Sequence, residues 1–383
     1  MNVLVIGSDP RIFEHDSESF LRAREYAGLF GEYHVVSSAP AGAEPYREGN
    51  LFLWPASSRF FLFWPLYAFT IGRNIARQRK IDVVDAQDAG ECGIVAFCIA
   101  RGLKKPFRVQ IHTDIVSPRY RRASWKEYAR WILARFLIPR ADCIRAVSGR
   151  IRRSIETRDK RQETKISVLP IFTDMSRFIS AALNPETERR FKDYNFKMIA
   201  AGRLVDKEKN FSMLIDVMRI FARISPQALL VIVGDGRDRT NCESRIRNYG
   251  LEKNVILEPW RDDLPSFYKS FDLFVSASNY EGWGRAVIEA MAVGLPVVMT
   301  DVGLAGEVVK NGANGIVVPV GNTQAFLHAI KTLYQDPEKR EQLATAASKT
   351  AKNLEPRTRE EYLVRYRECL ESCMTKPQKL DRK

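Results

Sequence analysis

Two glutamates, Glu281 and Glu289, lie eight positions apart in the stretch NYEGWGRAVIEAMAVGLPVV (279–298). Glu281 comes before a predicted helix over 286–293, and Glu289 lies inside that helix. The free N–H groups and the dipole at a helix N-terminus attract phosphate, whereas carboxylates can accept hydrogen bonds from sugar hydroxyls. Eight helical positions span about 12 Å. The spacing therefore suits one elongated ligand, with sugar hydroxyls at the first acid, phosphate at the helix start and ribose hydroxyls at the second acid.

The residues next to Glu281 favour phosphate binding at this helix start. Gly282 and Gly284 flank Trp283 and allow the backbone to come close to a ligand. Arg285 adds a positive charge at the same point. Packing in the core is the alternative role for Trp283.

Two cations follow the predicted strand MIAAG (198–202). Arg203 offers a planar fork of donors and Lys209 a compact charge, and a diphosphate would take both. Lys207 is a rival for the role of Lys209, and a pair of exposed surface charges is the structural alternative. No Asp-x-Asp pair suggests a metal for the diphosphate, so the sequence predicts no metal site.

A glycine-containing loop follows the next predicted strand. Gly234 and Gly236 lie in VGDGRDR (233–239), directly after an apolar run. The chain contains no G-x-G-x-x-G and no Walker A phosphate loop, which counts against a nicotinamide dehydrogenase and a P-loop NTPase.

These candidates need elements that bring them to one edge of a sheet. Short buried strands alternate with helices along the chain, a pattern typical of parallel sheets that are covered on both faces. The pattern starts again after a polar stretch over 171–195. The sequence therefore predicts two doubly wound domains, over 1–180 and 190–355, whose ligands bind at the carboxyl ends of the strands. A helix over about 356–376 and a basic tail follow.

The composition is that of a globular protein long enough for two domains. The chain has 383 residues, of which 45% are hydrophobic and 28% charged. It begins with an apolar strand rather than a basic and apolar leader, so no signal peptide is expected. The six cysteines are scattered, and no histidine lies close to Cys369 and Cys373 in sequence. We therefore expect reduced thiols in a cytoplasmic protein.

The positive charge is concentrated in one window. The formal net charge is +14, and residues 119–165 hold 15 Lys and Arg against 5 Asp and Glu. Aromatic residues interleave with the basic ones near helical spacing: Trp125, Tyr128, Trp131 and Phe136. An anionic membrane surface, a solvated helix face and nucleic acid are the three interpretations. No nucleic-acid-binding signature supports the third, so we expect no nucleic-acid partner.

An apolar segment over 50–80 raises the question of a membrane span. Its densest run, Phe60 to Ile71, is a dozen residues long and contains Pro65. About 20 residues are needed to cross a bilayer. A buried or interfacial helix is the prediction.

The stretch that contains Glu281 and Glu289 resembles the signature of a known family. EGWGRAVIEAMAVGLPVV (281–298) resembles the Glu-x7-Glu signature of retaining glycosyltransferases of family 4, which have the GT-B fold of two facing Rossmann-like doubly wound domains. AGRLVDKEKN (201–210) and LLVIVGDG (229–236) are similar to other elements of that family, in the family's order. The resemblance runs from about residue 80 to 335. In the GT-B fold, a helix such as 356–376 crosses back onto the first domain.

The resemblance implies a role for each matching residue on the donor side. Arg203, Lys209 and the loop after Gly234 would hold the donor diphosphate, and Glu281 would contact hydroxyls of the transferred sugar. Glu289 would bind the ribose of a nucleotide-sugar, either a UDP- or a GDP-sugar. Residues 282–285 would meet the phosphates, partly through the backbone. No cofactor is implied.

On the acceptor side the resemblance implies a role for His112, which follows the predicted strand 107–111. His112 would face the reacting sugar across the cleft; a core histidine is the structural alternative. Asp88, Asp16 and Ser17 follow other strand ends of the first domain and are candidate acceptor contacts. The loop after the first strand, GSDPRIFEHDSES, departs from the family pattern, so the acceptor contacts cannot be carried over.

The sequence therefore predicts a retaining glycosyltransferase that builds a glycan or a glycolipid on a lipid-linked or glycan acceptor. It would act in the cytoplasm, as a peripheral protein on the inner face of the membrane. A phosphorylase or an epimerase with the same fold is an alternative reaction. A non-catalytic sugar-nucleotide sensor or a scaffold of a glycan-assembly complex is the alternative outside enzymes.

Overall fold

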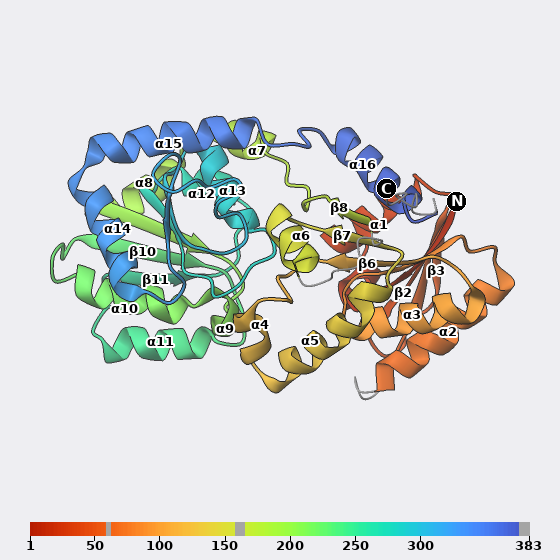
Figure 1. Ribbon diagram of the computed structural model, residues 1–383. Helices are drawn as coiled ribbons and strands as arrows, with labels where there is room; N and C mark the ends of the chain where they lie inside the picture. Colours follow the sequence, from red (N-terminus) through yellow and green to blue (C-terminus); the bar gives the residue numbers. More distant parts are fainter. Residues whose placement is uncertain (59–62, 158–164, 375–383) are drawn as a thin grey trace, which may run out of the picture. The chain divides into compact units, whose positions relative to one another are not determined.

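The computed structural model describes residues 1–58, 63–157 and 165–374 (Figure 1). The chain forms two compact units. Unit 1 contains Met1–Pro170 and the segment from Glu360 onward, and unit 2 contains Ile171–Arg359. Each unit is built on one mainly parallel sheet, so the predicted pair of doubly wound sheets is confirmed.

The sheet of unit 1 is parallel except for its edge strand β3, which pairs antiparallel with β4. Its inner strands are short runs of Val, Ile and Leu, such as NVLVI in β1, because helices cover both faces of such a sheet. Across the sheet the described strands are β3 (Tyr46–Glu48), β4 (Leu51–Ala56), β2 (Glu32–Ser38), β1 (Asn2–Ile6), β5 (Val83–Ala86), β6 (Phe107–Ile111), β7 (Cys143–Ala146) and β8 (Lys165–Val168).

The helices of unit 1 alternate with these strands. They are α1 (Glu18–Ala27), α2 (Trp64–Gln78), α3 (Glu91–Leu103), α4 (Pro118–Arg122), α5 (Trp125–Leu137), α6 (Gly149–Glu156) and α16 (Arg359–Glu371), with 3-10 turns η1 (Pro10–Phe13) and η3 (Ile138–Arg140). Within the described residues no helix is both long and apolar enough to cross a bilayer. Parts of the apolar run 60–71 and of the basic window 119–165 lie outside the described residues.

The sheet of unit 2 is parallel in every described pairing. Across the sheet the strands are β11 (Val255–Glu258), β10 (Ala228–Val233), β9 (Phe196–Ala201), β12 (Leu273–Ser276), β13 (Val297–Thr300) and β14 (Ile316–Val318). The helices are α7 (Ser176–Ile179), α8 (Pro185–Arg190), α9 (Asp206–Lys209), α10 (Phe211–Phe221), α11 (Arg239–Asn248), α12 (Leu264–Tyr268), α13 (Arg285–Val293), α14 (Thr323–Gln335) and α15 (Pro337–Lys352). The apolar faces of α10 and α14 pack on the sheet and make its core.

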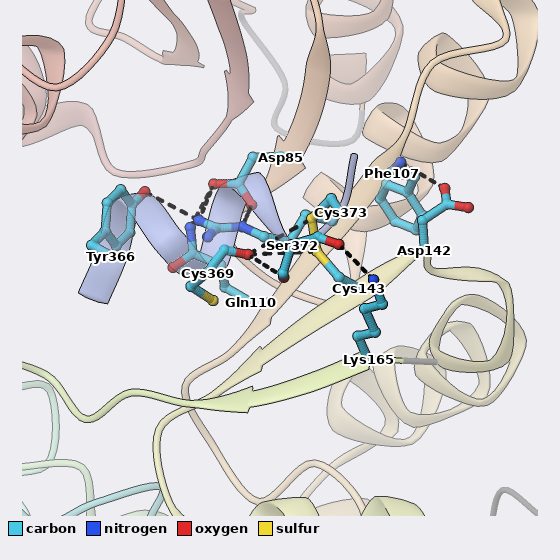
Figure 2. Close-up of a disulfide and its surroundings, with 11 residues drawn as sticks. Asp85, Phe107, Gln110, Asp142, Cys143, Lys165, Tyr366, Cys369, Ser372 and Cys373 are labelled. Carbon is cyan, nitrogen blue, oxygen red and sulfur yellow. Dashed lines mark hydrogen bonds and ion pairs between the residues drawn. A yellow bond between two sulfur atoms is a disulfide. The ribbon is translucent and has the colours of Figure 1, made fainter. Parts of the chain in front are cut away.

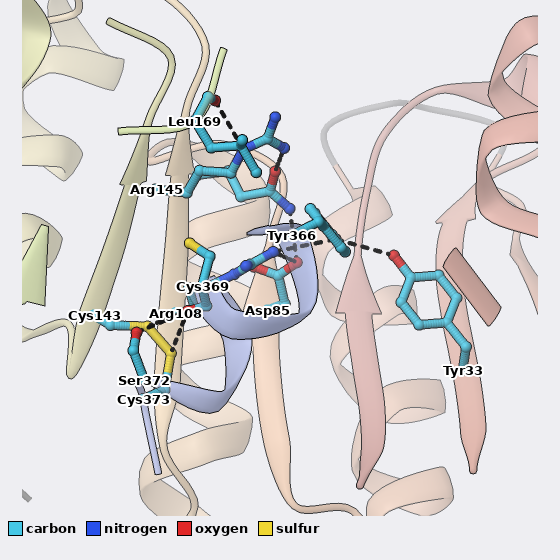
Figure 3. A network of polar contacts seen from close by, with 11 residues as sticks. Tyr33, Asp85, Arg108, Cys143, Arg145, Leu169, Tyr366, Cys369, Ser372 and Cys373 are labelled. Carbon is cyan, nitrogen blue, oxygen red and sulfur yellow. Dashed lines mark hydrogen bonds and ion pairs between the residues drawn. A yellow bond between two sulfur atoms is a disulfide. The ribbon is translucent and has the colours of Figure 1, made fainter. Parts of the chain in front are cut away.

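Helix α16 joins unit 1 through a buried polar network (Figure 3). Asp85 on β5 and Arg108 on β6 form a doubly bonded ion pair at 2.8 and 2.9 Å. The Arg108 guanidinium also donates to the Tyr366 hydroxyl at 3.1 Å, and Arg145 on β7 donates to the Tyr362 hydroxyl at 2.8 Å. All five side chains are buried. The last helix is therefore tied to three strands that lie more than 200 residues earlier in the chain.

A disulfide links the same two parts of unit 1 (Figure 2). Cys143 on β7 and Cys373, just beyond α16, are bonded, with their Cα atoms 5.2 Å apart. The expectation of reduced thiols is therefore wrong for this pair. A separation of 230 residues gave no sequence signal that the two would meet. The free cysteines are Cys92, Cys98, Cys242 and Cys369.

Candidate active site

The candidate donor residues of unit 2 gather at one edge of its sheet. Strands β10, β9 and β12 are neighbours and run parallel, so their carboxyl ends meet at the same edge. Arg203 follows β9, Gly234 follows β10 and Glu281 follows β12. The strand order thus brings together residues that are up to 78 positions apart in sequence.

Lys209 and Glu281 form an ion pair at this edge. Lys209 ends α9, and Glu281 lies in the loop between β12 and α13. Oxygen Oε1 of the same carboxylate accepts a hydrogen bond from the Ser278 hydroxyl at 2.9 Å. Both charged side chains are mostly buried, and attraction between charges is stronger there than in open water. A diphosphate at this edge would meet an ammonium group that is already held in position.

Polar contacts hold the Glu281 loop against α9. The N–H of Asn279 donates to the carbonyl of Glu208 at 2.7 Å, and its side-chain amide donates to the carbonyl of Lys207 at 3.2 Å. Asn210 adopts a φ of +54° directly after α9 and donates to the Asn279 side chain at 3.4 Å. These bonds fix the backbone on both sides of the cation and the carboxylate.

Gly234 allows the ends of β10 and β9 to approach each other. Its φ is +142°, and a Cβ atom there would lie 2.0 Å from the carbonyl oxygen of Gly202. Gly202 has a φ of +154°, and its own Cβ would lie 3.4 Å from the Lys209 side chain. A side chain at Gly234 would force these strand ends apart, whereas at Gly202 it is the positive φ that disfavours a side chain. The two glycines therefore bring bare backbone next to the Lys209 stem.

The other cations near β9 have different surroundings. The Arg203 side chain is 73% exposed and pairs with Glu208 at 3.2 Å. An exposed pair of this kind is worth about 0–1 kcal/mol, so little free energy opposes rotation of Arg203 toward a ligand. Lys207 lies in the middle of α9 and is half-buried. The side-chain contact with Glu281 is made by Lys209.

Helix α13 begins at the candidate phosphate-binding loop. Gly284 has a φ of +108° and comes directly before Arg285, the first helical residue. Gly282 and Trp283 are buried in the same loop, and the indole is only 5% exposed. The Trp283 carbonyl accepts from the Leu304 N–H at 3.1 Å. The Trp283 side chain thus packs in the core, while a contact of this loop with phosphate stays a prediction.

Glu289 lies one turn into α13 and is buried. The Arg285 guanidinium approaches its carboxylate at 3.7 Å. Burial, and then the negative charge of Glu289, raise the pKa of the Tyr268 phenol well above its usual value. The Tyr268 hydroxyl finds no hydrogen-bond partner among the described residues. A buried carboxylate flanked by an arginine and a phenol is suited to accept hydrogen bonds from ligand hydroxyls.

The charges at this edge suit a diphosphate better than a metal ion. Arg203, Lys209 and the N-terminus of α13 are positive, and Glu281 and Glu289 supply acceptors for hydroxyl groups. In the part of the chain that the structure describes, no three His, Cys, Asp or Glu side chains are grouped as metal ligands. The residues that could hold a ligand here are thus cations and single carboxylates.

His112 lies in unit 1, directly after β6, and is half-buried. Burial, and then the positive charges of Arg145, Arg22 and Arg108, lower the pKa of His112 to about 3. The imidazole is therefore neutral at pH 7 and has one donor and one acceptor nitrogen. Its predicted role toward the transferred sugar stays a prediction.

Acidification is expected to destabilise the protein through His112. The pKa of this imidazole is about 3 in the folded chain and about 6.5 in an unfolded one, so the unfolded state takes up the proton first as the pH falls. The stability that His112 contributes is complete above pH 6.5 and is lost between pH 6.5 and 3, with about 2 kcal/mol lost from pH 7 to 5. Urea unfolding at these two pH values measures the loss.

In His112→Gln the loss in free energy of unfolding between pH 7 and 5 should be smaller by the amount that His112 contributes. His328 is exposed on α14, so His328→Gln should retain the wild-type difference. A His112→Gln protein that loses as much stability as the wild type would contradict the assigned pKa.

The candidate acceptor residues of unit 1 lie at two different strand ends. Asp88 follows β5, and its Oδ1 accepts from the Gly90 N–H at 2.7 Å, next to the start of α3. The Ser17 hydroxyl caps α1 by accepting from the Phe20 N–H at 3.1 Å. Asp16 is exposed beside it. Ser17 therefore has a structural role, and contacts of these three residues with an acceptor stay predictions.

Two features of the site were missed by the sequence analysis. Ser278 donates to Glu281, and the short polar run SASN (276–279) before the signature was a signal for it. Gly303 has a φ of +53°, and a Cβ there would lie 2.4 Å from the Trp283 carbonyl oxygen. The loop after β13 therefore packs on the start of α13. Nothing in the local sequence pointed to this contact.

Known protein families match both units. The family of glycosyl transferases group 1 matches residues 186–350, and glycosyltransferase family 4 matches residues 22–177. The two matches meet close to the boundary between the units. Together they account for most of the chain.

Individual relatives are similar over different lengths. The lipopolysaccharide core biosynthesis glycosyltransferase LpsE of Rhizobium meliloti (strain 1021) is 31% identical over 153 residues, which are 40% of this chain and 44% of the relative. The capsular polysaccharide biosynthesis glycosyltransferase CapM of Staphylococcus aureus is 25% identical over 330 residues, 84% of this chain and 85% of the relative. The chain spans about half the length of the first two curated relatives that it matches.

The fold is shared with a solved structure over nearly the full chain. The crystal structure of Anabaena Alr3699/HepE in complex with UDP-glucose has a TM-score of 0.73 at 20% identity, and covers 97% of this chain and 99% of that chain. That likeness concerns the fold: two Rossmann-like units, each built on a parallel sheet. With the two family matches and the glycosyltransferase relatives, it follows that this chain belongs to the family 4 glycosyltransferases of GT-B fold.

Proposed function

We propose that the protein is a retaining hexosyltransferase that moves a sugar from a nucleotide-sugar to a glycan or a lipid-linked acceptor in polysaccharide or glycoconjugate synthesis. The observation that carries the proposal is the ion pair between Lys209 and Glu281. It lies in the loop that leads to α13, at the sheet edge where Gly234 packs closely on Gly202. A cation, a hydroxyl acceptor and a helix N-terminus are thus grouped as a sugar diphosphate requires.

The chemistry depends on the leaving group. As the bond from the anomeric carbon to the diphosphate oxygen breaks, negative charge grows on that oxygen. Lys209, Arg203 and the N-terminus of α13 offer positive charge to stabilise it. Because the Lys209 ammonium is already held by Glu281, little reorganisation is needed when the charge develops. Glu281 would orient the sugar through its hydroxyls, and Glu289 the ribose.

Retention follows if the acceptor attacks from the face that the diphosphate leaves. The acceptor oxygen forms the new bond to the anomeric carbon, and its proton passes to the departing phosphate oxygen. His112 is neutral at pH 7, so we assign it a hydrogen bond to the transferred sugar rather than a charge interaction. Alignment of the acceptor then supplies the rest of the rate enhancement.

The names of similar proteins guide the choice of substrates. HepE binds UDP-glucose, and LpsE and CapM act in lipopolysaccharide core and capsular polysaccharide synthesis. We propose a UDP- or GDP-sugar as donor and a growing glycan or a lipid-linked sugar as acceptor. Reaction with a nucleotide-sugar places the proposed activity in the cytoplasm.

Calorimetric titration with UDP, GDP, ADP and dTDP tests the donor site. One nucleotide should bind well to the wild type, and Glu289→Ala should weaken it by about 10- to 100-fold, because hydrogen bonds to a charged group contribute about 1.5–3 kcal/mol. Glu341→Ala is the matched control, since Glu341 is exposed on α15. If no nucleotide binds, or if both variants bind like the wild type, the assignment of the donor site is wrong. Binding without turnover would favour a non-catalytic sensor or scaffold.

A further inference from the structure

Helices α2 and α5 of unit 1 carry large apolar side chains on their exposed surfaces. On α5, Trp125 is 84% exposed, and Tyr128, Ile132 and Phe136 follow it as exposed residues. Their spacing of three and four positions places them in one stripe along the helix. Exposed apolar residues that are contiguous, rather than scattered, indicate an interaction surface.

Apart from Phe136, whose ring also meets Phe97 on α3, the stripe on α5 is distinct from the face that holds this helix in the fold. The opposite face is buried through Trp131, Ala134 and Leu137. Helix α5 thus needs no further apolar contact for its own packing. The exposed stripe remains available for a partner outside the chain.

Helix α2 carries a second exposed group. Leu66 is 64% exposed, and Phe63 and Tyr67 beside it are exposed as well. Further along the same helix, Arg73 and Arg77 are exposed. Buried residues on the other side, such as Ala68 and Ile75, hold the helix on unit 1. Helix α2 therefore presents apolar residues at its start and cations toward its end.

The two helices lie on the same side of the unit 1 sheet. Helix α3 contacts both α2 and α5, and Figure 1 shows the three side by side along the lower face of that sheet. Phe97 on α3 meets Phe136 on α5 with ring centroids 5.6 Å apart. The Arg101 side chain on α3 donates to the Arg140 carbonyl at 2.8 Å. We call the exposed residues of α2, of α5 and of α4, which packs against α5, the basic aromatic face.

The charge on this face is mainly positive. Arg130 on α5 is half-buried and pairs with Glu91 on α3 at 2.8 Å. In all, helices α2, α4 and α5 contain eight Lys and Arg residues, two, three and three in turn, against a single acid of their own. That acid, Glu127, is buried and accepts a hydrogen bond from Ser124. Trp125 and Lys126 are adjacent exposed residues, as are Arg135 and Phe136. A partner must therefore accept apolar side chains and bring negative charge.

We propose that the basic aromatic face docks on the surface of an anionic phospholipid bilayer. Lipid headgroups supply the negative charge, and the interfacial region beneath them accepts Trp, Tyr, Phe and Leu side chains. Duplex nucleic acid would pair with the cations but offers the exposed stripe of α5 no apolar layer. The described helices that carry the face are too short and polar to span a bilayer. In this proposal they lie along its surface. This docking does not depend on the proposed transfer reaction.

Vesicle flotation with the full chain tests the apolar part of the face. The wild type should float with vesicles that contain phosphatidylglycerol and should bind phosphatidylcholine vesicles far more weakly. Trp125→Ser with Ile132→Ser should lower binding by about tenfold or more, because the exposed stripe no longer enters the interface. Both side chains are exposed, so thermal unfolding should match the wild type. Ile224→Ser with Arg223→Gln changes exposed residues of unit 2 and should bind like the wild type.

A second variant tests the charge. Lys126→Gln with Arg135→Gln should lower binding to the anionic vesicles by about tenfold or more, and added salt should weaken the wild type more than this variant. Wild-type protein that stays unbound to anionic vesicles would overturn the proposal, as would binding as strong as that of the wild type in both double variants. Binding to duplex DNA without binding to vesicles would overturn it as well. Each double variant should bind nucleotide like the wild type. A failure of membrane docking can therefore be distinguished from a failure of the donor-site assignment.

Discussion

Lys209→Met is expected to lower the rate of sugar transfer by about 100- to 1,000-fold, the range seen when one group that stabilises developing negative charge is removed. Lys209 is the cation whose side chain contacts Glu281 at the edge of the unit 2 sheet. Methionine has a similar length and no charge, so the change removes the ammonium group and little packing volume. The loss should appear mainly in kcat, because the charge on the leaving diphosphate oxygen is largest in the transition state.

Lys207→Met is the matched control for this experiment. Lys207 lies in the same short helix and points its carbonyl, rather than its ammonium group, toward Asn279. We expect less than about a fivefold loss, because the half-buried Lys207 does not make the contact with Glu281. Lys209→Arg should recover part of the activity, because it restores the charge in a different shape. A large loss in Lys207→Met with normal turnover in Lys209→Met would transfer the role to Lys207.

The second large effect concerns stability. Asp85→Leu is expected to destabilise unit 1 by about 3–5 kcal/mol, the cost of removing one partner from a buried ion pair. Asp85 is the carboxylate that faces the Arg108 guanidinium (Figure 3). It also accepts a hydrogen bond from the Gln110 amide at 2.7 Å. Arg145 is buried in the same network. Without Asp85, the buried guanidinium groups of Arg108 and Arg145 would have uncharged phenol, amide and carbonyl oxygens as their acceptors and no carboxylate.

Calorimetric scanning of the full chain measures this effect. For a unit of this size, the expected loss lowers the Tm of unit 1 by about 6–20 °C. The double variant Asp85→Leu with Arg108→Met should recover part of the loss, because the uncompensated charge is reduced. Arg367→Gln breaks an exposed pair with Glu371 on α16 and should change the Tm of unit 1 by less than about 2 °C. An Asp85→Leu protein with the same Tm as the wild type would show that the network contributes little to stability.

Both sheets could be predicted from the sequence because their strands are continuous apolar runs. ALLVIV in β10 and NVLVI in β1 are buried over nearly their whole length, and such runs between helices are typical of parallel sheets. The order of the strands across each sheet could not be read in the same way. Adjacent runs have similar composition, and their pairing depends on how the helices cover the two faces.

The donor residues could be predicted because they lie next to one another in sequence or directly after a strand. Glu281 and Glu289 lie in one loop and the helix that follows it, so their separation depends on eight consecutive positions of the chain. Lys207 and Lys209 were the two candidates for the diphosphate contact, and the structure pairs Lys209 with Glu281. That choice depends on the left-handed turn at Asn210 and its bond to Asn279. Such contacts between distant loops leave no periodic signal.

The sequence by itself determined that this protein has two doubly wound sheets and a phosphate-suited helix start with an acid on each side. Local periodicity and residue chemistry are sufficient for those features. Tertiary structure alone decided that α16 returns to Asp85, Arg108 and Arg145, that Cys143 bonds Cys373, and that α2 and α5 present one exposed face. The hydrogen bonds and the disulfide among these features join residues that are 217 to 258 positions apart. Only the packed chain brings such segments within reach of hydrogen bonds and of one common surface.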